Sequence, residues 1–353
     1  MFLSNSQVEK YQETLARAKR WVTTHYPRLV AEPDLQAHYK APYFWASMGD
    51  MVMGGKHVRH IQDKFLRQDG DFRMGENQKG FVKFLCTLQN QYIYPNGWLI
   101  AGLRKLGAHD LARKGMSFIL PFQDPKFGGF YRGFDPEKKT MMRDLMDSSS
   151  TSSAGMAALA CGRMVEAERA GDFILKLLAL QPEPDRYFFS CMTPEGKVHA
   201  DVFKSENQWD PDSRKQKCLS TESDAGNELT WLIGKPNKFL SRLYTATGKE
   251  KYLDGARQCF QFFHKLEKNA WTSFASCKTM WAGAEMYRLT GEKEFAETAV
   301  RILDHYCATQ TATGTWVHTL WYKSEAEQTL SWSADITLEY GAEISDVLFD
   351  LCV

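Results

Sequence analysis

Apolar residues recur at helical spacing in three separated stretches of the chain, each starting at a glycine. Counted from Gly107, Gly248 and Gly291, position four is Leu, Tyr or Phe, position eight is Gly or Ala, and positions eleven, twelve and fifteen are mostly apolar. This spacing predicts one amphipathic helix used three times. A weaker copy starts at Gly162, and the last two copies lie 43 residues apart. Such a period is typical of helical-hairpin arrays.

A more uniformly apolar stretch precedes each amphipathic helix, and a last one ends the chain. These stretches cover residues 98–106, 154–161, 239–246, 275–289 and 330–351. Uniformly apolar helices belong inside a protein and amphipathic ones outside. With helices near residues 7–25, 38–53 (ended by Gly54-Gly55) and 56–67, the count is six of each kind. Because no polar capping repeat is evident, we predict an all-α fold: a single closed (α/α)6 barrel over residues 1–353.

Long segments join each outer helix to the next inner helix, so they gather on one rim of the predicted barrel. They cover residues 123–146, 181–227 and 309–329. The second is predicted to be a rim insertion with a β-hairpin over residues 188–198, where hydrophobic and polar residues alternate around a Pro-Glu-Gly turn. Loops held by a rigid scaffold commonly carry function. We therefore expect the active site at this rim.

The stretch from Met146 to Ala160 indicates where a central cavity lies. It has an acid and a run of hydroxyls, then only small and apolar residues. Asp147 or one of the serines is placed to cap the helix. The helix has almost no polar face, so it is predicted to be buried nearly all round, with its polar start opening towards a cavity.

Composition and charge exclude several classes of function. The 353 residues are 43% hydrophobic and 25% charged, with a net charge of +1 and no apolar run long enough to span a membrane. This balance argues against nucleic-acid and membrane partners and favours a small-molecule substrate. The eight cysteines are scattered without a Cys-x-x-Cys, which is typical of reduced thiols. We expect a cytoplasmic monomer or homodimer.

Three rim turns share a glutamine, a glycine and an aromatic residue, at 68–72, 123–130 and 310–316. They resemble turns of the terpenoid-cyclase and protein-prenyltransferase toroids. The segment from Asp147 to Ala158 resembles the inner-helix start of six-hairpin unsaturated-glucuronyl hydrolases. These resemblances imply the toroid fold and leave the activity open. The acidic and zinc-binding motifs of those families have no counterpart, and only Asp147 matches a hydrolase acid. We therefore predict no metal and no cofactor.

Carboxyl groups near the rim are the first candidates for acid-base chemistry. They are Asp71, Asp147, Asp210, Glu222, Asp224, Glu228 and Asp335. Burial among aromatic side chains raises the pKa of a carboxyl group and suits it to proton transfer. Asp147 and Asp335 stand out because apolar stretches follow them. The structural alternatives are a helix cap for Asp147 and a hydrogen-bonded core acid for Asp335, which shares a helix face with Glu339.

Histidine, arginine and tryptophan side chains complete the candidate site. His318 lies between Trp316 and Trp321 and is a candidate general base. His57 and His60 have metal-ligand spacing, but their helix is polar, which favours a solvated face. The candidate catalytic residues are thus Asp71, Asp147, His318 and Asp335. The candidate substrate-binding residues are Trp45, Trp98, Tyr131, Arg132, Trp209, Glu228, Trp231, Trp281, Trp316 and Trp332.

Two enzyme classes and a binding scaffold are consistent with this pattern. The leading hypothesis is a metal-independent cyclase or isomerase of secondary metabolism, which protonates a small, largely apolar terpenoid or polyketide intermediate from Asp147 or Asp335. Tryptophans would stabilise developing positive charge. The alternative is a carbohydrate-active hydrolase, lyase or epimerase with two rim carboxylates, roughly 5 to 10 Å apart in a hydrolase. The third is a non-catalytic scaffold, which a cavity filled by side chains would favour.

Overall fold

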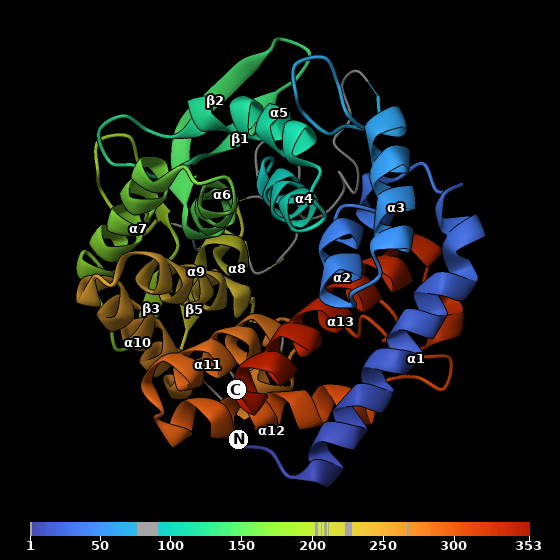
Figure 1. Ribbon diagram of the computed structural model, residues 1–353. Coiled ribbons are helices and arrows are strands. Elements are labelled where there is room, and N and C mark those ends of the chain that lie inside the picture. The colour runs from blue at the N-terminus through green and yellow to red at the C-terminus, as the bar shows by residue number, and fades with distance from the viewer. Residues whose placement is uncertain are drawn as a thin grey trace.

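Six inner helices form a closed ring in the computed structural model (Figure 1). The structure describes residues 2–75, 91–201, 204–205, 207, 210, 212–222, 228–266 and 268–353. Within them each inner helix packs against the next, and the last packs against the first. The inner helices are α2 (Ala41–Ser47), α4 (Tyr94–Lys105), α6 (Ser148–Ala160), α9 (Trp231–Thr247), α11 (Cys277–Thr290) and α13 (Leu330–Cys352).

An outer layer of helices surrounds this ring. Its members are α1 (Asn5–Leu29), α3 (Met51–Lys64), α5 (His109–Ile119), α7 (Met164–Ala179), α10 (Glu250–Lys265) and α12 (Lys293–Thr309). Five of them pack on the inner helix that precedes them, and α1 packs on α13. The two chain ends therefore meet, and the Phe2 amide donates to the Leu351 carbonyl at 3.2 Å. The prediction of an all-α (α/α)6 barrel is confirmed.

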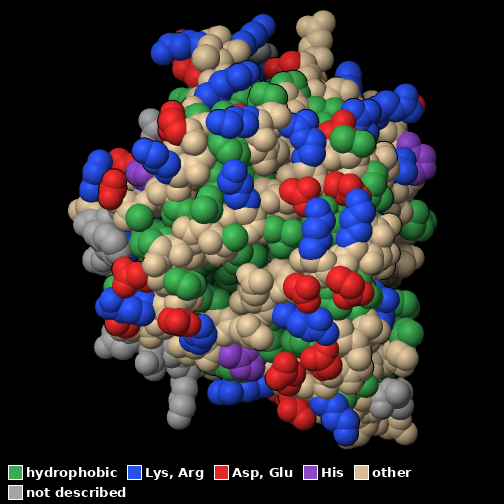
Figure 2. Space-filling view, turned by 90° about the vertical axis from the view of Figure 1, so that its left-hand side faces the viewer, with side chains coloured by type: hydrophobic (Ala, Val, Ile, Leu, Met, Phe, Trp, Pro, Cys, Tyr) green, Lys and Arg blue, Asp and Glu red, His purple; other side chains and the backbone are tan. Residues whose placement is uncertain are grey.

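The apolar positions of the repeated helix pattern form the contact between the two layers. In α10 and α12 the predicted positions are buried in both copies: Tyr252 and Phe295, Ala256 and Ala299, Cys259 and Ile302, Phe260 and Leu303, Phe263 and Tyr306. The surface opposite them is charged. On the side of α7 and α10, Figure 2 shows basic and acidic side chains interspersed, and Lys249 pairs with Glu168 at 2.6 Å. None of the described helices combines the length and apolar character needed to cross a bilayer.

Each turn from an inner helix to its outer partner holds a glycine with positive φ. Gly107, Gly162, Gly248 and Gly291 have φ between 66° and 77°, and Gly49 has 67°. This left-handed conformation ends a helix and disfavours side chains other than glycine. The predicted helix end at Gly54-Gly55 is wrong, because both glycines lie inside α3. The break occurs at Gly49, and Asp50 then caps α3 by accepting from the Met53 amide.

The rim opposite these turns carries short strands. β1 (Tyr131–Asp135), β2 (Thr140–Asp147) and β4 (Cys191–Met192) form one antiparallel sheet, and β3 (Tyr187–Phe189) pairs with β5 (Cys218–Ser220). The main hairpin is β1–β2, which we had not predicted. Within the predicted hairpin at 188–198 the chain folds back on itself: Met192 forms an antiparallel bridge with Val198, and the Thr193 amide donates to the Lys197 carbonyl at 2.9 Å. The strands β3 and β4 also pair outside it, with β5 and β2. The remaining short elements are α8 (Arg214–Lys217), η1 (Leu35–Ala37), η2 (Leu120–Phe122), η3 (Lys268–Thr272) and η4 (Glu325–Glu327).

The glutamine-glycine-aromatic turns clamp the rim onto the outer helices. Gly70, Gly128 and Gly314 have positive φ, and a Cβ at each would lie within 2.5 Å of a backbone carbonyl oxygen of α5, α7 or α1. The Gln123 side chain donates to the carbonyls of Gly128 and Glu166 at 2.9 and 2.8 Å. These turns hold the long rim segments at a fixed position relative to the barrel.

Candidate functional site

A pocket opens on the barrel axis at the ends where the inner helices begin. Its lining side chains come from α4, α9, α11, α13 and the segments that precede α2, α4, α11 and α13. Those used below are Tyr39, Lys40, Tyr94, Trp231, Lys235, Phe274, Cys277, Lys278, His318, Trp332, Asp335 and Glu339. We call this the rim pocket. It combines aromatic walls with acids, lysines and one histidine.

Asp335 is the acid of the rim pocket with a raised pKa. Its side chain is one-tenth exposed, and the Lys40 ammonium lies 2.9 Å from its Oδ1. Burial raises the pKa of Asp335 to about 6, although the positive charge of Lys40 acts in the opposite direction. Both protonation states are therefore accessible near neutral pH, as general acid-base catalysis requires.

Glu339 lies one helical turn further along α13 and is held in its charged form. Lys40 approaches it to 2.5 Å, and Lys278 makes a second ion pair. Burial alone would raise the pKa of Glu339, but the two ammonium groups outweigh it and hold this pKa well below its usual range. The two neighbouring carboxyl groups thus differ in their readiness to take up a proton.

His318 lines the same pocket from the last rim loop. Its ring packs against Phe274 and Trp332, with centroids 4.3 and 4.8 Å away. Burial lowers its pKa to about 3, so the ring is neutral at physiological pH. The Gln328 side chain fixes this loop by accepting from the His318 amide at 2.6 Å and donating to the Trp316 carbonyl at 2.8 Å.

Apart from Oδ1 of Asp335, which pairs with Lys40, two buried polar atoms of the described rim pocket have no hydrogen-bond partner: Nδ1 of His318 and Nε1 of Trp231. The residues that carry them are 3% and 7% exposed. Most buried polar groups in folded proteins are paired. The two atoms are therefore placed to form hydrogen bonds with a ligand.

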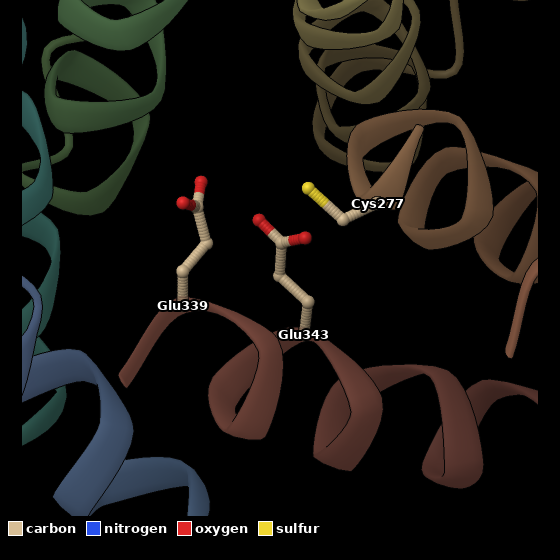
Figure 3. A group of neighbouring side chains, drawn as sticks. All are labelled: Cys277, Glu339 and Glu343. Carbon is tan, nitrogen blue, oxygen red and sulfur yellow. The ribbon is translucent and has the colours of Figure 1, made fainter. Parts of the chain in front are cut away.

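Deeper in the barrel, Cys277, Glu339 and Glu343 converge from α11 and α13 (Figure 3). One ligand atom from each lies within 4.8 Å of the others, which is metal-ligand spacing. The Lys278 ammonium, however, already pairs with both carboxylates. Burial raises the pKa of the Cys277 thiol well above its usual range, whereas metal binding requires the thiolate. This arrangement is better described as a buried ion-pair cluster than as a metal centre.

A second cavity, which we call the axial cavity, continues the rim pocket along the axis. It is lined by Trp98 and Trp281, whose rings stack with centroids 5.9 Å apart. Tyr94, Lys235 and Lys278 line both cavities. The structure thus brings together six predicted site residues: His318, Asp335, Trp231 and Trp332 in the rim pocket, and Trp98 and Trp281 in the axial cavity.

The other two predicted catalytic acids lie outside these cavities. Asp147 caps α6: its Oδ1 accepts from the Ser150 amide at 2.6 Å and its Oδ2 from the Ser150 hydroxyl at 3.0 Å. Asp71 is fully buried and accepts from Tyr92 at 2.6 Å and Asn96 at 2.9 Å. The Asp147 carboxyl group thus caps its own helix, and that of Asp71 ties a rim turn to α4 through Asn96.

Five predicted substrate-binding residues have structural contacts elsewhere. Trp45 donates to His57, Trp316 to the Tyr306 carbonyl and Tyr131 to Asp124, at 2.7 to 2.9 Å. Arg132 contacts the Cys191 sulfur at 3.5 Å, and Glu228 pairs with Arg214 at 3.1 Å. None of these five lines the rim pocket or the axial cavity. Trp209 and Asp224 lie outside the described residues.

The predicted solvated face for His57 and His60 is wrong for His57, which is fully buried. It belongs to a chain of hydrogen bonds. Trp45 donates to Nδ1 of His57 at 2.9 Å, Nε2 of His57 lies 3.3 Å from Nδ1 of His38, and Nε2 of His38 lies 3.1 Å from the Glu32 carbonyl. Because indole only donates and a carbonyl only accepts, both rings must be neutral and protonated on Nε2.

The lysines of the barrel axis were not predicted from the sequence. Lys40, Lys238 and Lys278 are almost completely buried. A signal was present in α13, where acids lie three or four residues apart on an otherwise apolar helix: Asp335, Glu339, Glu343, Asp346 and Asp350. A buried acidic stripe requires buried cations on the facing helices. Inner-helix lysines therefore should have been predicted to face the axis.

No protein-family model and no curated protein sequence matches the chain. Solved structures match its fold. D-mannose isomerase aligns with a TM-score of 0.62 at 10% identity, over 89% of this chain and 86% of that one. Cellobiose 2-epimerase from Bacillus thermoamylovorans gives 0.61 at 10%, over 91% and 89%. A type II terpene cyclase from Scytonema gives 0.53 at 10%, over 99% of both chains.

These similarities, together with the closed double ring of helices, define the class of fold. The chain has the (α/α)6 toroid fold, which is also the fold of a mannose isomerase, a glycoside hydrolase and a terpene cyclase of known structure. Identities of about one in ten residues establish the fold alone, so the activity has to be argued from the rim pocket.

Proposed function

We propose that the protein is a carbohydrate-active isomerase or epimerase that moves a proton next to a carbonyl carbon of a sugar. The observation that carries the proposal is the pairing, in one pocket, of Asp335, whose pKa is about 6, with the unpartnered Nδ1 of His318. One group exchanges a proton near neutral pH. The other offers a fixed hydrogen bond to a polar substrate.

Asp335 takes the role of the base in this proposal. Its ionised carboxylate abstracts the proton from the carbon beside the carbonyl, and the electron pair of the broken C–H bond gives an enediolate. In isomerisation the neighbouring hydroxyl proton moves to the former carbonyl oxygen, and the carboxyl group returns its proton to the former carbonyl carbon. In epimerisation the enediolate turns its other face to the carboxyl group, which returns the proton to the original carbon. The neutral His318 ring accepts a hydrogen bond from a sugar hydroxyl through Nδ1, and Lys40 keeps the pKa of Asp335 from rising further.

The pocket walls support a sugar as the substrate. Trp231, Phe274 and Trp332 supply aromatic faces, and an indole N–H that lacks a partner is suited to donate to a hydroxyl or ring oxygen. Asp335 and Glu339 are the acids of the described pocket lining, and both contact Lys40 from one face of α13. Paired-carboxylate hydrolysis places its acids on opposite sides of the bond, so this arrangement favours proton transfer over hydrolysis.

Deuterium exchange tests the proposal without knowledge of the exact sugar. The protein is incubated in D2O with a panel of aldoses, ketoses and disaccharides with a free reducing end, and proton NMR follows the signal of the carbon-bound hydrogen beside the carbonyl. We expect loss of this signal with at least one sugar. Asp335→Asn should abolish the exchange, and His318→Gln should slow it at least tenfold.

Matched variants on the outer helix α5 serve as controls. Asp110→Asn and His109→Gln make the same chemical changes at exposed positions and should exchange like the wild-type protein. If no sugar exchanges, or if exchange persists in Asp335→Asn, the proposed reaction is wrong.

A proton-initiated cyclase is the second candidate, because the acid with the raised pKa adjoins the aromatic axial cavity. In that case Asp335 would donate its proton to a double bond, and the tryptophan faces would stabilise the cation. Incubation with linear terpenoid alcohols would then give a cyclised product of unchanged mass. The three lysines of the rim pocket favour the sugar reaction over this one, because their positive charge would repel a carbocation intermediate.

A further inference from the structure

The axial cavity has an apolar surface although three lysines line it. Two of the ammonium groups are paired with acids: Lys238 with Glu285 at 2.7 Å, and Lys278 with Glu339 and Glu343. The third, that of Lys235, lies 3.8 Å from the centroid of the Tyr94 ring. The surface that remains open to the cavity is mostly carbon.

The aromatic side chains of the cavity also have their polar atoms paired with neighbouring residues. The indole N–H of Trp98 donates to the Tyr94 hydroxyl at 2.8 Å, and that of Trp281 to Asp346 at 3.1 Å. The Tyr43 hydroxyl also donates to Asp346, at 2.8 Å. The polar atoms of these three aromatic side chains are hydrogen-bonded to neighbouring residues. Their ring carbons therefore remain available to contact a ligand.

One polar atom of the cavity is an exception. The Ser152 residue is 1% exposed, and its hydroxyl has no hydrogen-bond partner. Its neighbour Ser153 instead donates to the Tyr94 carbonyl at 3.1 Å. A buried unpaired hydroxyl costs free energy unless a ligand satisfies it. An apolar group attached through an oxygen atom would satisfy both the carbon walls and Ser152.

We propose that the axial cavity binds a short alkyl substituent that is joined through oxygen to the sugar held in the rim pocket. The substrate class is thus an alkyl-substituted sugar, an inference that rests on the proposed function. Tyr94, Lys235 and Lys278 line both cavities, so one ligand can extend from Asp335 into the axial cavity. The cavity has a volume of about 50 Å³, room for a few non-hydrogen atoms.

Fluorine NMR on protein labelled with 5-fluorotryptophan tests the cavity by itself. The Trp98 and Trp281 resonances are assigned with Trp98→Phe and Trp281→Phe. We expect 1-butanol to shift both resonances and leave that of the core residue Trp45 unchanged, while glycerol shifts none of the three. If 1-butanol leaves Trp98 and Trp281 unshifted, the axial subsite is overturned.

A filled cavity provides the matched comparison. Ser152→Leu places a side chain in the cavity and should abolish the response to 1-butanol, whereas Ser117→Leu makes the same change on exposed α5 and should preserve it. If Ser152→Leu does not fold, Ser152→Val replaces it. A response that survives the filling substitution would contradict the proposal.

The substrate class is tested with O-alkyl derivatives that leave the reducing end free. The sugar that exchanges deuterium is compared as its methyl and n-butyl ethers. The affinity should rise about fourfold per added methylene until the cavity is full, and equal affinities would overturn the proposal. Exchange without a response to 1-butanol rejects the subsite alone. A response without exchange rejects the proposed reaction and leaves the apolar cavity established.

Discussion

The Lys40 ammonium lies 2.9 Å from a carboxylate oxygen of Asp335, although 295 positions separate the two residues in the chain. Lys40 enters from the segment before the first inner helix, and Asp335 lies near the start of the last. The contact therefore forms across the seam at which the ring closes. It also places the main cation of the rim pocket beside the acid to which we assign proton transfer.

Replacing Lys40 with methionine should both destabilise the protein and move its pH dependence. Removal of one partner from a buried ion pair typically costs about 3 to 5 kcal/mol, measurable by urea denaturation. The pKa of Asp335, about 6 beside Lys40, should rise without the positive charge. The lower limb of the pH profile for exchange should shift upward with it. Lys40→Arg, which keeps the charge, should restore most of the wild-type profile, and an unshifted limb in Lys40→Met would argue against Asp335 as the base.

Substitutions of the two buried acids Asp147 and Asp335 should have different effects: that of Asp147 on stability, and that of Asp335 on activity. Asp147→Ala removes the cap of α6 and should lower the free energy of unfolding by about 1 kcal/mol, while deuterium exchange persists. Asp147→Ser, which keeps a capping oxygen, should recover most of the loss. Asp335→Asn should abolish exchange. Loss of exchange in Asp147→Ala, with the fold intact by circular dichroism, would restore Asp147 as a catalytic candidate.

The histidine chain in the outer layer should make stability depend on pH. Burial lowers the pKa of His38 to about 4 and that of His57 well below its usual range. Because the unfolded state binds protons at higher pH than the folded state, this stability is complete above the unfolded pKa of about 6.5 and declines as the pH falls. At pH 5 the loss should reach about 2 kcal/mol for each buried histidine.

Comparison with a variant isolates this effect from other titrating groups. Carboxyl groups with raised pKa values, such as Asp335, change stability in the opposite direction over part of the same range. His57→Gln removes one titrating ring and should therefore flatten the decline between pH 7 and pH 5 relative to wild type. Urea denaturation at several pH values measures both slopes. Equal slopes would show that His57 does not titrate on unfolding.

Gly128 and Gly248 both have a left-handed backbone conformation, but replacement by alanine should destabilise the protein to different extents. Gly248 has open space around its missing Cβ, so Gly248→Ala should cost about 1 to 2 kcal/mol for the left-handed conformation alone. At Gly128 a Cβ would also lie 2.3 Å from the Arg169 carbonyl oxygen. Gly128→Ala should therefore be the more destabilising substitution by thermal melting. Equal melting temperatures would mean that the rim turn moves away from α7 at little cost.

The helix order and the two layers were predictable from the sequence. Helical periodicity and the difference between apolar and amphipathic stretches are local properties, because one helix meets one kind of environment along its length. The glycines at the layer turns were readable for the same reason, since a left-handed turn constrains a single residue. Gly54-Gly55 misled the prediction because close packing against Leu106 and Trp45, a long-range contact, requires a small residue at Gly54.

The site could be predicted only in part. Asp335, His318 and four of the tryptophans were identified because they lie near the rim ends of inner helices. Asp147 has the same local pattern, but its carboxyl group is used at the helix start. Which side of a short rim segment faces the axis depends on how that segment is anchored, and no periodicity encodes it.

What the sequence determined by itself was the closed ring of paired helices and the rim at which the site lies. The tertiary structure decided which charges meet on the axis. Lys40, Lys278 and the acids of α13 are far apart in the chain, and their pKa values depend on desolvation and on neighbours only a few ångströms away. Helix periodicity places a side chain on the inner face, but the distance between two opposing side chains is fixed only when the ring closes.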